Sequence, residues 1–403
     1  MPQIKPEVEA FARIKVLGIG GSGKNALNHM INSKVKGVDF IAVNTDSQDL
    51  HHSLSKKKIH IGKNLTRGLG AGMNPELGRR AVEETKEEIQ EALKGADMVF
   101  IAGGLGGGTC TGAAPTVAKV AKEMGALTVA VVTKPFFFEG QQRMRLAEAG
   151  LEELRQAVDA IITIPNDRLL STISKETTAK NAFAMCDDVL KSAVEGISDL
   201  ITTPGIINID FADIKAVMAD AGPALMGIGT ATGEKRAEEA AKAAINSPLL
   251  EVSINGAKGV LFSIAGGDDL GMFEIQDAAK IITESVDPNA RIIFGTVRDE
   301  KLKKGEVKIT VIASNFPENF TKKTLFQSQP MTSTQTAHST PETVSRRESS
   351  NAASEEKGKI YNSIPVQTRE QREVPREEKA EVAVEEEDEW GAVPAFLRRS
   401  KIK

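Results

Sequence analysis

A glycine-rich loop at Gly103–Gly112 is the segment of this sequence whose residue types point most directly to chemistry. Its sequence, GGLGGGTCTG, holds six glycines in ten residues. Consecutive glycines let several backbone amides point into one concavity, which suits a diphosphate or triphosphate. Thr109 and Thr111 add hydroxyl donors. A close-packed turn between a strand and a helix is the alternative, and the density of glycine argues against it.

A second glycine-rich loop, GIGGSGKN, begins at Gly18 directly after an apolar run. Its glycines match the dinucleotide fingerprint G-x-G-x-x-G. Gly23 and Lys24 also match most of the P-loop pattern G-x-x-x-x-G-K-[ST], but Asn25 stands where a hydroxyl should hold magnesium. In either interpretation a tight turn into a helix presents free N–H groups to an anion. A nicotinamide enzyme has no need of a second phosphate-binding loop like the one at Gly103–Gly112.

The segments around these loops alternate between short apolar runs and helical patterns. The runs are continuously apolar, which is typical of parallel strands buried on both faces. A helix is expected from Pro75 to Lys94, with Asn74 as its N-cap. The pattern predicts a Rossmann-like parallel sheet with helices on both faces. The expected strands are Ile14–Gly18, Phe40–Val43, Met98–Ala102, Leu127–Thr133 and Ala160–Ile164.

The second half of the chain predicts a long helix followed by a second α/β unit. Apolar residues at helical spacing run from about Thr177 to Thr202, and a Thr-Pro-Gly turn ends the pattern. We expect this helix to join the two units. Beyond it, helices are expected near 212–220, 234–246 and 274–286, and strands near 259–265, 291–297 and 307–313.

Residues 321–385 are polar and charged, with few large apolar side chains. Such a segment cannot bury enough surface to offset its ordering entropy, so we expect it to be disordered. The final stretch, EDEWGAVPAFLRRSKIK, holds the only Trp of the chain within a short apolar patch. An apolar patch at the end of a disordered tether is typical of a docking peptide, with a frayed terminus as the alternative.

Composition excludes several classes of protein. The net charge of −4 over 403 residues gives no sign of a nucleic-acid or anionic-membrane partner. The two cysteines have neither metal-binding nor disulfide spacing, and no residues mark a metal site. No apolar run approaches the roughly 20 residues that a membrane span requires. The first residues do not resemble a signal peptide, so a cytoplasmic protein without membrane insertion is expected.

The loop G-G-G-T-x-[ST]-G after a strand is the signature of the tubulin superfamily, and the wider chain resembles the FtsZ family of bacterial cell-division GTPases, which form protofilaments. The resemblance covers about residues 11–318 and the terminal peptide. The matching segments are GIGGSGKNA (18–26), AVNTDSQDL (42–50), TRGLGAGMNPELG (66–78), GGGTCTGAAP (106–115), KPFFFEG (134–140), IPNDRLL (164–170), GISDLITTPG (196–205), NIDFADIKAVM (208–218) and VPAFLRR (393–399).

The resemblance implies a tubulin/FtsZ-like fold, a site for GTP or GDP, and Mg²⁺ bound mainly through the phosphates and water. It also implies six parts of the chain: an N-terminal extension (1–12), a GTP-binding domain (13–176), a central helix (177–203), a GTPase-activating domain (204–318), a disordered linker (319–385) and a partner-binding peptide (386–403). The implied partners are further copies of the chain, joined head to tail, and membrane-tether and division-regulator proteins that bind the peptide. The implied location is the division septum.

The residues implied to contact nucleotide fall into two groups. Glu139 and Arg143 would hold the ribose, although a surface ion pair is the alternative for two residues at this spacing. Phe183 would stack on the base, and Asp187 would accept from guanine N1–H and N2–H, which favours GTP over ATP. Core packing and a solvated helix face are their respective alternatives. The other implied contacts are Gly20, Gly21, Ser22, Gly23, Lys24, Asn25, Asn44, Asp46, Ala71, Gly72, Gly104, Gly107, Gly108, Thr109, Cys110 and Asn166.

The catalytic residues that the resemblance implies are Asp210 and Asp213, in the segment NIDFAD. Helix capping is the alternative, since Asp is common at helix N-termini. In the family this segment meets the nucleotide of the next subunit, so the two carboxylates would orient the attacking water there. One subunit would then bind GTP and hydrolyse it slowly, and assembly would complete the site.

Two residues depart from the family pattern. Cys110 replaces a glycine, which restricts the backbone beside the phosphates and places a thiol of lowered pKa at a helix N-terminus. Lys24 stands in place of a small or neutral residue and would either approach the phosphates or project to solvent. An assembling GTPase is the leading hypothesis. A Rossmann oxidoreductase and a nucleotide-binding regulator that no longer hydrolyses are the alternatives.

Overall fold

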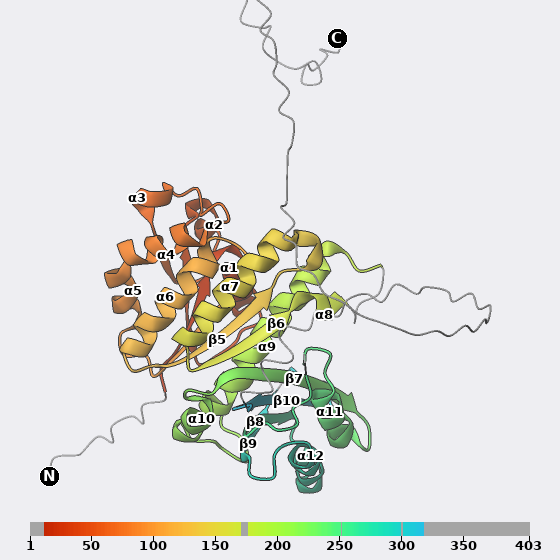
Figure 1. Ribbon diagram of the computed structural model, residues 1–403. Helices are drawn as coiled ribbons and strands as arrows, with labels where there is room; N and C mark the ends of the chain where they lie inside the picture. Colours follow the sequence, from red (N-terminus) through yellow and green to blue (C-terminus); the bar gives the residue numbers. More distant parts are fainter. Residues whose placement is uncertain (1–11, 171–175, 251, 300, 318–403) are drawn as a thin grey trace, which may run out of the picture. The chain divides into compact units, whose positions relative to one another are not determined.

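The computed structural model describes residues 12–170, 176–250, 252–299 and 301–317 (Figure 1), so the expected linker and terminal peptide lie outside the described residues. The strands are β1 (Ile14–Ile19), β2 (Val38–Asn44), β3 (Lys57–His60), β4 (Met98–Gly104), β5 (Leu127–Lys134), β6 (Ala160–Pro165), β7 (Gly222–Thr232), β8 (Gly259–Gly266), β9 (Arg291–Arg298) and β10 (Glu306–Ser314). The helices are α1 (Gly20–Asn32), α2 (Ser47–His51), α3 (Lys63–Thr66), α4 (Pro75–Glu84), α5 (Lys86–Leu93), α6 (Thr109–Glu123), the 3₁₀ turn η1 (Phe137–Glu139), α7 (Gln141–Ala157), α8 (Asn166–Leu170), α9 (Ala179–Thr202), α10 (Phe211–Met218), α11 (Arg236–Ile245) and α12 (Met272–Glu284).

The first six strands form the parallel sheet that the sequence predicts. Their order is β3-β2-β1-β4-β5-β6, and every neighbouring pair is parallel. The order reverses between β1 and β4, and ligands of open α/β sheets bind beside such a switch point, beyond the carboxyl ends of the strands. The two glycine-rich loops directly follow β1 and β4. The topology therefore brings together two loops that lie about eighty residues apart in the sequence.

The second unit continues the same sheet. β7 pairs with β6 in parallel, from Ala160 opposite Gly222 to Ile162 opposite Ala224. β10 then lies antiparallel between β7 and β8, and β9 is parallel to β8. The sheet order is thus continuous over ten strands.

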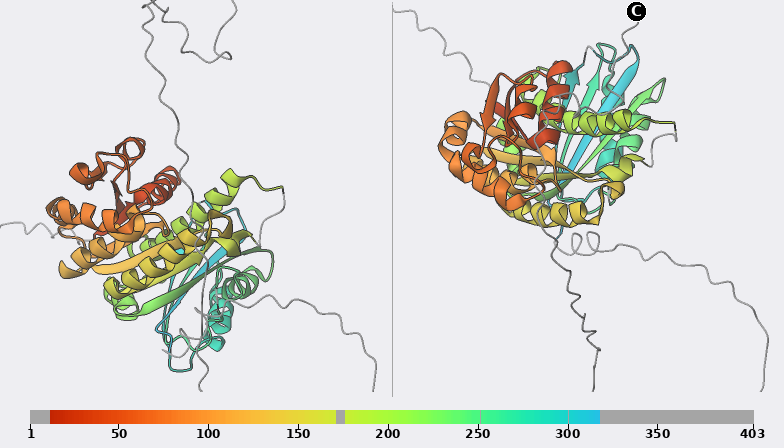
Figure 2. Two further views of the ribbon diagram at one scale, coloured as in Figure 1. Left: turned by 45° about the horizontal axis from the view of Figure 1, so that its top comes forward. Right: turned by 90° about the horizontal axis from the view of Figure 1, so that it is seen from above.

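Helices cover both faces of the strands (Figure 2). The residues of β1 alternate, with Ile14 and Val16 in the core formed with α1, α9 and α10, and Leu17 and Ile19 in the core formed with α4 to α7. A third core joins α11 and α12 to β8 and β10. The long helix α9 carries buried residues along its length and packs against α1, β5, β8 and β9. It therefore contacts strands of both units.

The structure corrects two details of the expected elements. The helix expected from Pro75 to Lys94 is two helices, α4 and α5, because the backbone of Thr85 leaves helical geometry (φ −119°, ψ 24°). The Thr85 hydroxyl donates to Ala81 O at 2.9 Å, a local bond that competes with regular helix geometry. Asn74 caps α4 as predicted, accepting from Glu76 N–H. Strands β3 and β7 were not predicted.

Candidate functional site

A cavity of about 420 Å³ lies where the sheet order reverses. This volume falls within the range typical of small-molecule sites, about 300–1,000 Å³. Predicted contact residues from five separate segments meet there. Those that line it are Gly20, Gly21, Ser22, Asn25, Gly104, Gly107, Gly108, Thr109, Cys110, Glu139, Arg143, Asn166, Phe183 and Asp187.

Two helices begin at this cavity, and neither has its first N–H groups capped by a side chain. The N-cap of α1 is Ile19 and that of α6 is Gly108, and neither makes a side-chain capping bond. Neither helix has an acidic residue in its first turn. The two loops are tied together because Gly104 N–H donates to Ser22 Oγ at 2.7 Å. Two uncapped helix N-termini aimed at one cavity form a site for an anionic group such as a diphosphate.

The cavity has room, and one buried polar atom without a partner, where a ligand would bind. A Cβ built at Gly107 would meet nothing within 4 Å. Asn166 Oδ1 is buried and has no hydrogen-bond partner within the protein. A buried acceptor without a partner is costly, and a donor from a ligand would satisfy it. The residues present therefore fit a bound nucleotide.

The far end of the cavity is formed by Phe183 and Asp187 on α9. Phe183 is 46% exposed, so part of its ring is accessible for stacking, and the ring lies perpendicular to that of Phe136 with the two centroids 5.3 Å apart. Burial raises the pKa of the Asp187 carboxyl to about 6, and the nearby charges of His29 and Lys24 oppose this rise. At neutral pH the group is ionised and accepts hydrogen bonds. Both side chains line the cavity, so Phe183 is not buried in the core and Asp187 does not lie on a fully solvated helix face.

Glu139 and Arg143 form the ion pair that their spacing predicts, and both side chains also line the cavity. Glu139 is held from the other side because its Oε1 accepts from Phe136 N–H at 3.0 Å. Its side chain is 17% exposed and that of Arg143 is 41% exposed. Arg143 keeps donors available toward the cavity because its guanidinium carries five N–H groups.

Six predicted contact residues do not line the cavity. Gly23 packs against β4, since a Cβ there would lie 2.6 Å from Ala102 O. Ala71 packs against the loop at Gly108, because a Cβ built at Gly108 would lie 2.8 Å from the Cβ of Ala71. The others are Lys24, Asn44, Asp46 and Gly72.

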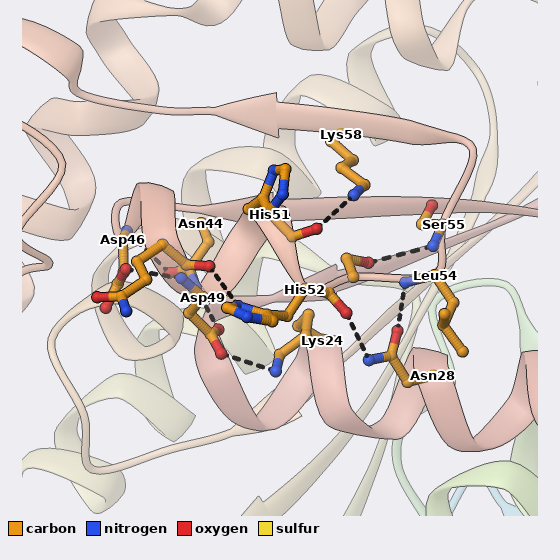
Figure 3. Close-up of polar contacts among 12 residues, drawn as sticks. Lys24, Asn28, Asn44, Asp46, Asp49, His51, His52, Leu54, Ser55 and Lys58 are labelled. Atoms are coloured by element: carbon orange, nitrogen blue, oxygen red, sulfur yellow. Dashed lines mark hydrogen bonds and ion pairs between the residues drawn. The ribbon is translucent and has the colours of Figure 1, made fainter.

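Both sequence interpretations of Lys24 were wrong, because the side chain neither lines the cavity nor projects to solvent. Its Nζ lies 2.7 Å from Asp49 Oδ1, and its side chain is 9% exposed (Figure 3). Asn44 belongs to the same contact network, since its Nδ2 donates to Asp49 Oδ2. Asp46 caps α2 by accepting from Asp49 N–H at 2.9 Å.

The structure contradicts the expectation of a reactive Cys110. Burial raises the pKa of its thiol to about 12. A Cβ at Gly103 would lie 2.5 Å from Cys110 Sγ, so the thiol packs against β4 and into the core beneath the loop. Cys110 is helical and is absent from the described residues with positive φ. The backbone at 110 is therefore unstrained and its amide is available to a ligand.

Asp210 is the N-cap of α10 and Asp213 lies in its first turn, and neither lines the cavity. Both are exposed. Asp210 caps α10, with Oδ1 accepting from Ala212 N–H at 2.6 Å, as the capping interpretation predicts. Among the described residues, neither the other oxygen of Asp210 nor the Asp213 carboxylate makes a hydrogen bond or ion pair, and both residues are accessible to a second molecule.

Sequence reasoning missed several residues of the site. Thr133 lies near the carboxyl end of β5 and Pro135 directly follows that strand, so the rule that ligands bind at the carboxyl ends of strands could have found them. Cys186 and Leu190 were assigned to the apolar face of the long helix, and one end of that face forms the cavity wall. Leu105 completes the lining. Among the described residues, no cluster of three or more His, Cys, Asp or Glu could hold a metal ion. Within the same ranges no helix combines the length and apolarity needed to cross a membrane.

Comparisons with known proteins identify the family. Residues 13–174 match the model of the Tubulin/FtsZ family GTPase domain, and residues 222–317 match that of the FtsZ family C-terminal domain. The structure of an empty FtsZ dimer from M. jannaschii is 47% identical, with a TM-score of 0.73, and the match covers 76% of this chain and 89% of that one. This chain belongs to the FtsZ family.

The fold extends to more distant relatives. A GTPγS-bound protofilament of CetZ2 from Haloferax volcanii matches at 21% identity with a TM-score of 0.64, over 78% of this chain and 97% of that one. GDP-bound monomeric CetZ1 from the same organism matches at 21% identity with a TM-score of 0.65, over 76% of this chain and 95% of that one. FtsZ membership makes this chain a GTP hydrolase of the tubulin fold. It excludes the oxidoreductase hypothesis, which rested on the loop at Gly18 alone.

Proposed function

We propose that this FtsZ-family GTPase assembles head to tail into protofilaments and hydrolyses GTP at the junctions between copies. The cavity of one copy would hold GTP, with its phosphates at the N-termini of α1 and α6 and its guanine between Phe183 and Asp187. Asp210 and Asp213 of the next copy would orient and polarise the water that attacks the γ-phosphate. A contact between two different surfaces does not close on itself, so repeated contacts build a filament.

The observation that carries this proposal is the distribution of carboxylates. The acidic residues that line the cavity are Glu139 and Asp187. Glu139 is paired with Arg143, and Asp187 lies at the base end on α9. The described lining thus supplies no free carboxylate at the phosphate end, whereas Asp213 is exposed on α10. A second copy would supply what the cavity lacks, and the dimeric state of the M. jannaschii FtsZ structure supports such an association.

The same proposal covers the cellular role. The filament would form the division ring at the septum, on the cytoplasmic side. Residues 386–403 would bind membrane-tether and regulator proteins, without nucleic acid and without insertion into the membrane. Mg²⁺ would be held mainly by the phosphates and water, where it would neutralise charge that develops during hydrolysis. The alternative of a GTP-binding regulator without hydrolysis rested on Cys110, and it is weakened because the thiol packs against Gly103 and the backbone at Cys110 has no positive φ.

The first experiment measures GTPase activity and light scattering against protein concentration. The specific activity should rise above a threshold concentration, and scattering should increase with GTP but not with GDP, ATP or NADH. The guanine-specific response follows from Asp187, since adenine offers no matching pair of donors on that edge. A specific activity that stays constant with concentration would contradict the shared site.

Mixing two inactive variants tests the shared site directly. Asp213→Ala keeps an intact cavity but lacks a carboxylate. Gly107→Leu fills the cavity without a clash, because nothing lies within 4 Å of its Cβ, and keeps Asp213. Each alone should hydrolyse GTP slowly, and the mixture should recover turnover at the junctions that combine the intact halves. The matched control is the double variant Gly107→Leu/Asp213→Ala, which carries both substitutions in one chain. Mixed with either single variant it should recover no turnover, because no junction then combines an intact cavity with Asp213. Absence of recovery, with Asp213→Ala still binding GTP and co-assembling, would contradict the mechanism.

A further inference from the structure

We propose that Lys24 and Asp49 form a positioning pair that sets the preference of the site for GTP over GDP. Lys24 lies about one turn into α1, and Asp49 lies on α2. The ammonium and carboxylate are 2.7 Å apart, with the lysine side chain buried (Figure 3). The inference rests on the proposed nucleotide site and assigns these two residues a role in it.

A chain of hydrogen bonds runs from Asp49 to the cavity wall. Asp49 Oδ2 accepts from Asn44 Nδ2 at 2.8 Å, and Asn44 Oδ1 accepts from Thr45 N–H at 2.9 Å. The Thr45 hydroxyl lies 2.7 Å from the hydroxyl of Thr109, which lines the cavity at the start of α6. The ion pair therefore fixes the end of β2 against the N-termini of both phosphate-binding helices.

The charge of Asp49 makes its partner necessary. Asp49 Oδ2 lies 3.6 Å from the position of a Cβ built at Gly21, and Gly21 lines the cavity. An unpaired carboxylate at this place would repel phosphate oxygens through a partly desolvated medium, where charges interact strongly. Lys24 neutralises it. Removing one partner of such a pair leaves the other as an uncompensated charge.

The position of the pair predicts which nucleotide is affected. GTP carries more negative charge and reaches further along the cavity than GDP, whereas both present the same base to Phe183 and Asp187. A disturbance at the base end changes both affinities equally. The ratio of the two affinities therefore reports on the phosphate end alone.

The experiment measures the affinities of the full chain for GTPγS and GDP by equilibrium titration. Lys24→Gln should lower the GTPγS:GDP affinity ratio about tenfold, because Asp49 keeps an unpaired charge. Asp49→Asn, which is nearly isosteric, should raise the ratio or leave it unchanged, because Lys24 keeps its positive charge. The double variant Lys24→Gln/Asp49→Asn should return the ratio to within about twofold of wild type.

The control is Lys122→Gln, which breaks ion pairs with Asp159 and Asp220 away from the cavity and should leave the ratio unchanged. A purely structural role would lower both affinities alike in both single variants, and that result would overturn the inference. So would a double variant that is no better than Lys24→Gln. A wild-type chain that binds neither nucleotide would instead contradict the proposed function.

Discussion

At the scale of single residues, the base end of the site depends on the ionisation of Asp187. Burial raises its carboxyl pKa from 3.8 to about 6, so the group is ionised above this pH and protonated below it. Only the ionised form accepts both guanine donors. Affinity for GTP should therefore fall as the pH is lowered, by about tenfold between pH 7.5 and pH 5 when one proton must be released.

Nucleotide titrations across this pH range check the prediction. Asp187→Asn should bind GTP weakly at every pH, with the profile flattened. Asp188→Asn is the matched control, since Asp188 is the next residue on α9 but does not line the cavity, and it should keep a pH-dependent profile. An unchanged wild-type affinity at pH 5 would show that Asp187 does not contact the base.

The residue scale also shows where sequence reasoning ends. The two glycine-rich loops were predicted from residue types and spacing, whereas Phe183 and Asp187 were implied by the family resemblance. The cavity is lined by residues of both loops together with Phe183 and Asp187. The directions of Lys24 and Cys110 were not predictable. Lys24 pairs with Asp49, which lies 25 positions away on a different helix. The Cys110 thiol occupies the space that a side chain at Gly103 would need. Both outcomes depend on tertiary contacts that local patterns do not contain.

At the scale of elements, the first turn of α6 is held in place by its close crossing with α4. A Cβ at Gly112 would lie 1.8 Å from Pro75 O, and one at Gly78 would lie 2.4 Å from Gly108 O. Only glycine permits this approach. The position of the phosphate-binding amides of α6 therefore depends on residues that contact no ligand.

Gly112→Ala tests this dependence. The added methyl must push α4 and α6 apart, which should cost about 1–3 kcal/mol of unfolding free energy and also weaken GTP binding. Denaturant unfolding and nucleotide titration measure the two effects. Lys119→Ala, an exposed change on the same helix, should alter neither. Full-strength GTP binding by Gly112→Ala would show that the crossing does not position the site.

The two strands that the sequence missed, β7 and β3, have different physical causes. β7 contains Gly227 and Gly229, which weaken a strand pattern. Both are required because α11 lies directly on the strand, with Cβ positions 2.0 Å from backbone oxygens of Ala244 and Ala240. β3 is short and lies at the sheet edge, with two exposed lysines. Strands shaped by a neighbouring helix or by an edge position lack the apolar run that revealed the others.

At the scale of the whole molecule, α9 links the two units of the sheet. The sequence predicted the helix and its joining role, but not that β7 would pair with β6 and make the strand order continuous. Near its C-terminal end, α9 carries Asp199, which lines a cavity shared with residues of β9 and of the connection to β10. The charge of the Asp199 carboxyl group therefore lies where α9 meets elements of the second unit.

Asp199 should make stability depend on pH. Burial raises its pKa from 3.8 to about 7; Glu195 and Asp299 add to the rise, while Lys301 and Lys308 oppose it. Between these two values the folded chain holds a proton that the unfolded chain has released. The free energy of unfolding should therefore fall as the pH rises through this window, by about 2 kcal/mol between pH 5 and pH 8.

Urea unfolding of the nucleotide-free chain at the two pH values measures this loss. Asp199→Asn should remove the contribution of Asp199, because an amide does not titrate, and should leave the variant more stable than wild type at pH 8. The smaller contribution of Asp187, whose pKa is also raised, should remain. Asp220→Asn is the control: the hydrogen bond from Lys122 lowers the Asp220 pKa, so that group stays ionised throughout and the wild-type pH dependence should persist. Asp199→Asn could instead lose as much unfolding free energy between pH 5 and pH 8 as the wild type. That result would show that the ionised Asp199 carboxylate is solvated, and that the contact between α9 and the β9–β10 connection does not bury it.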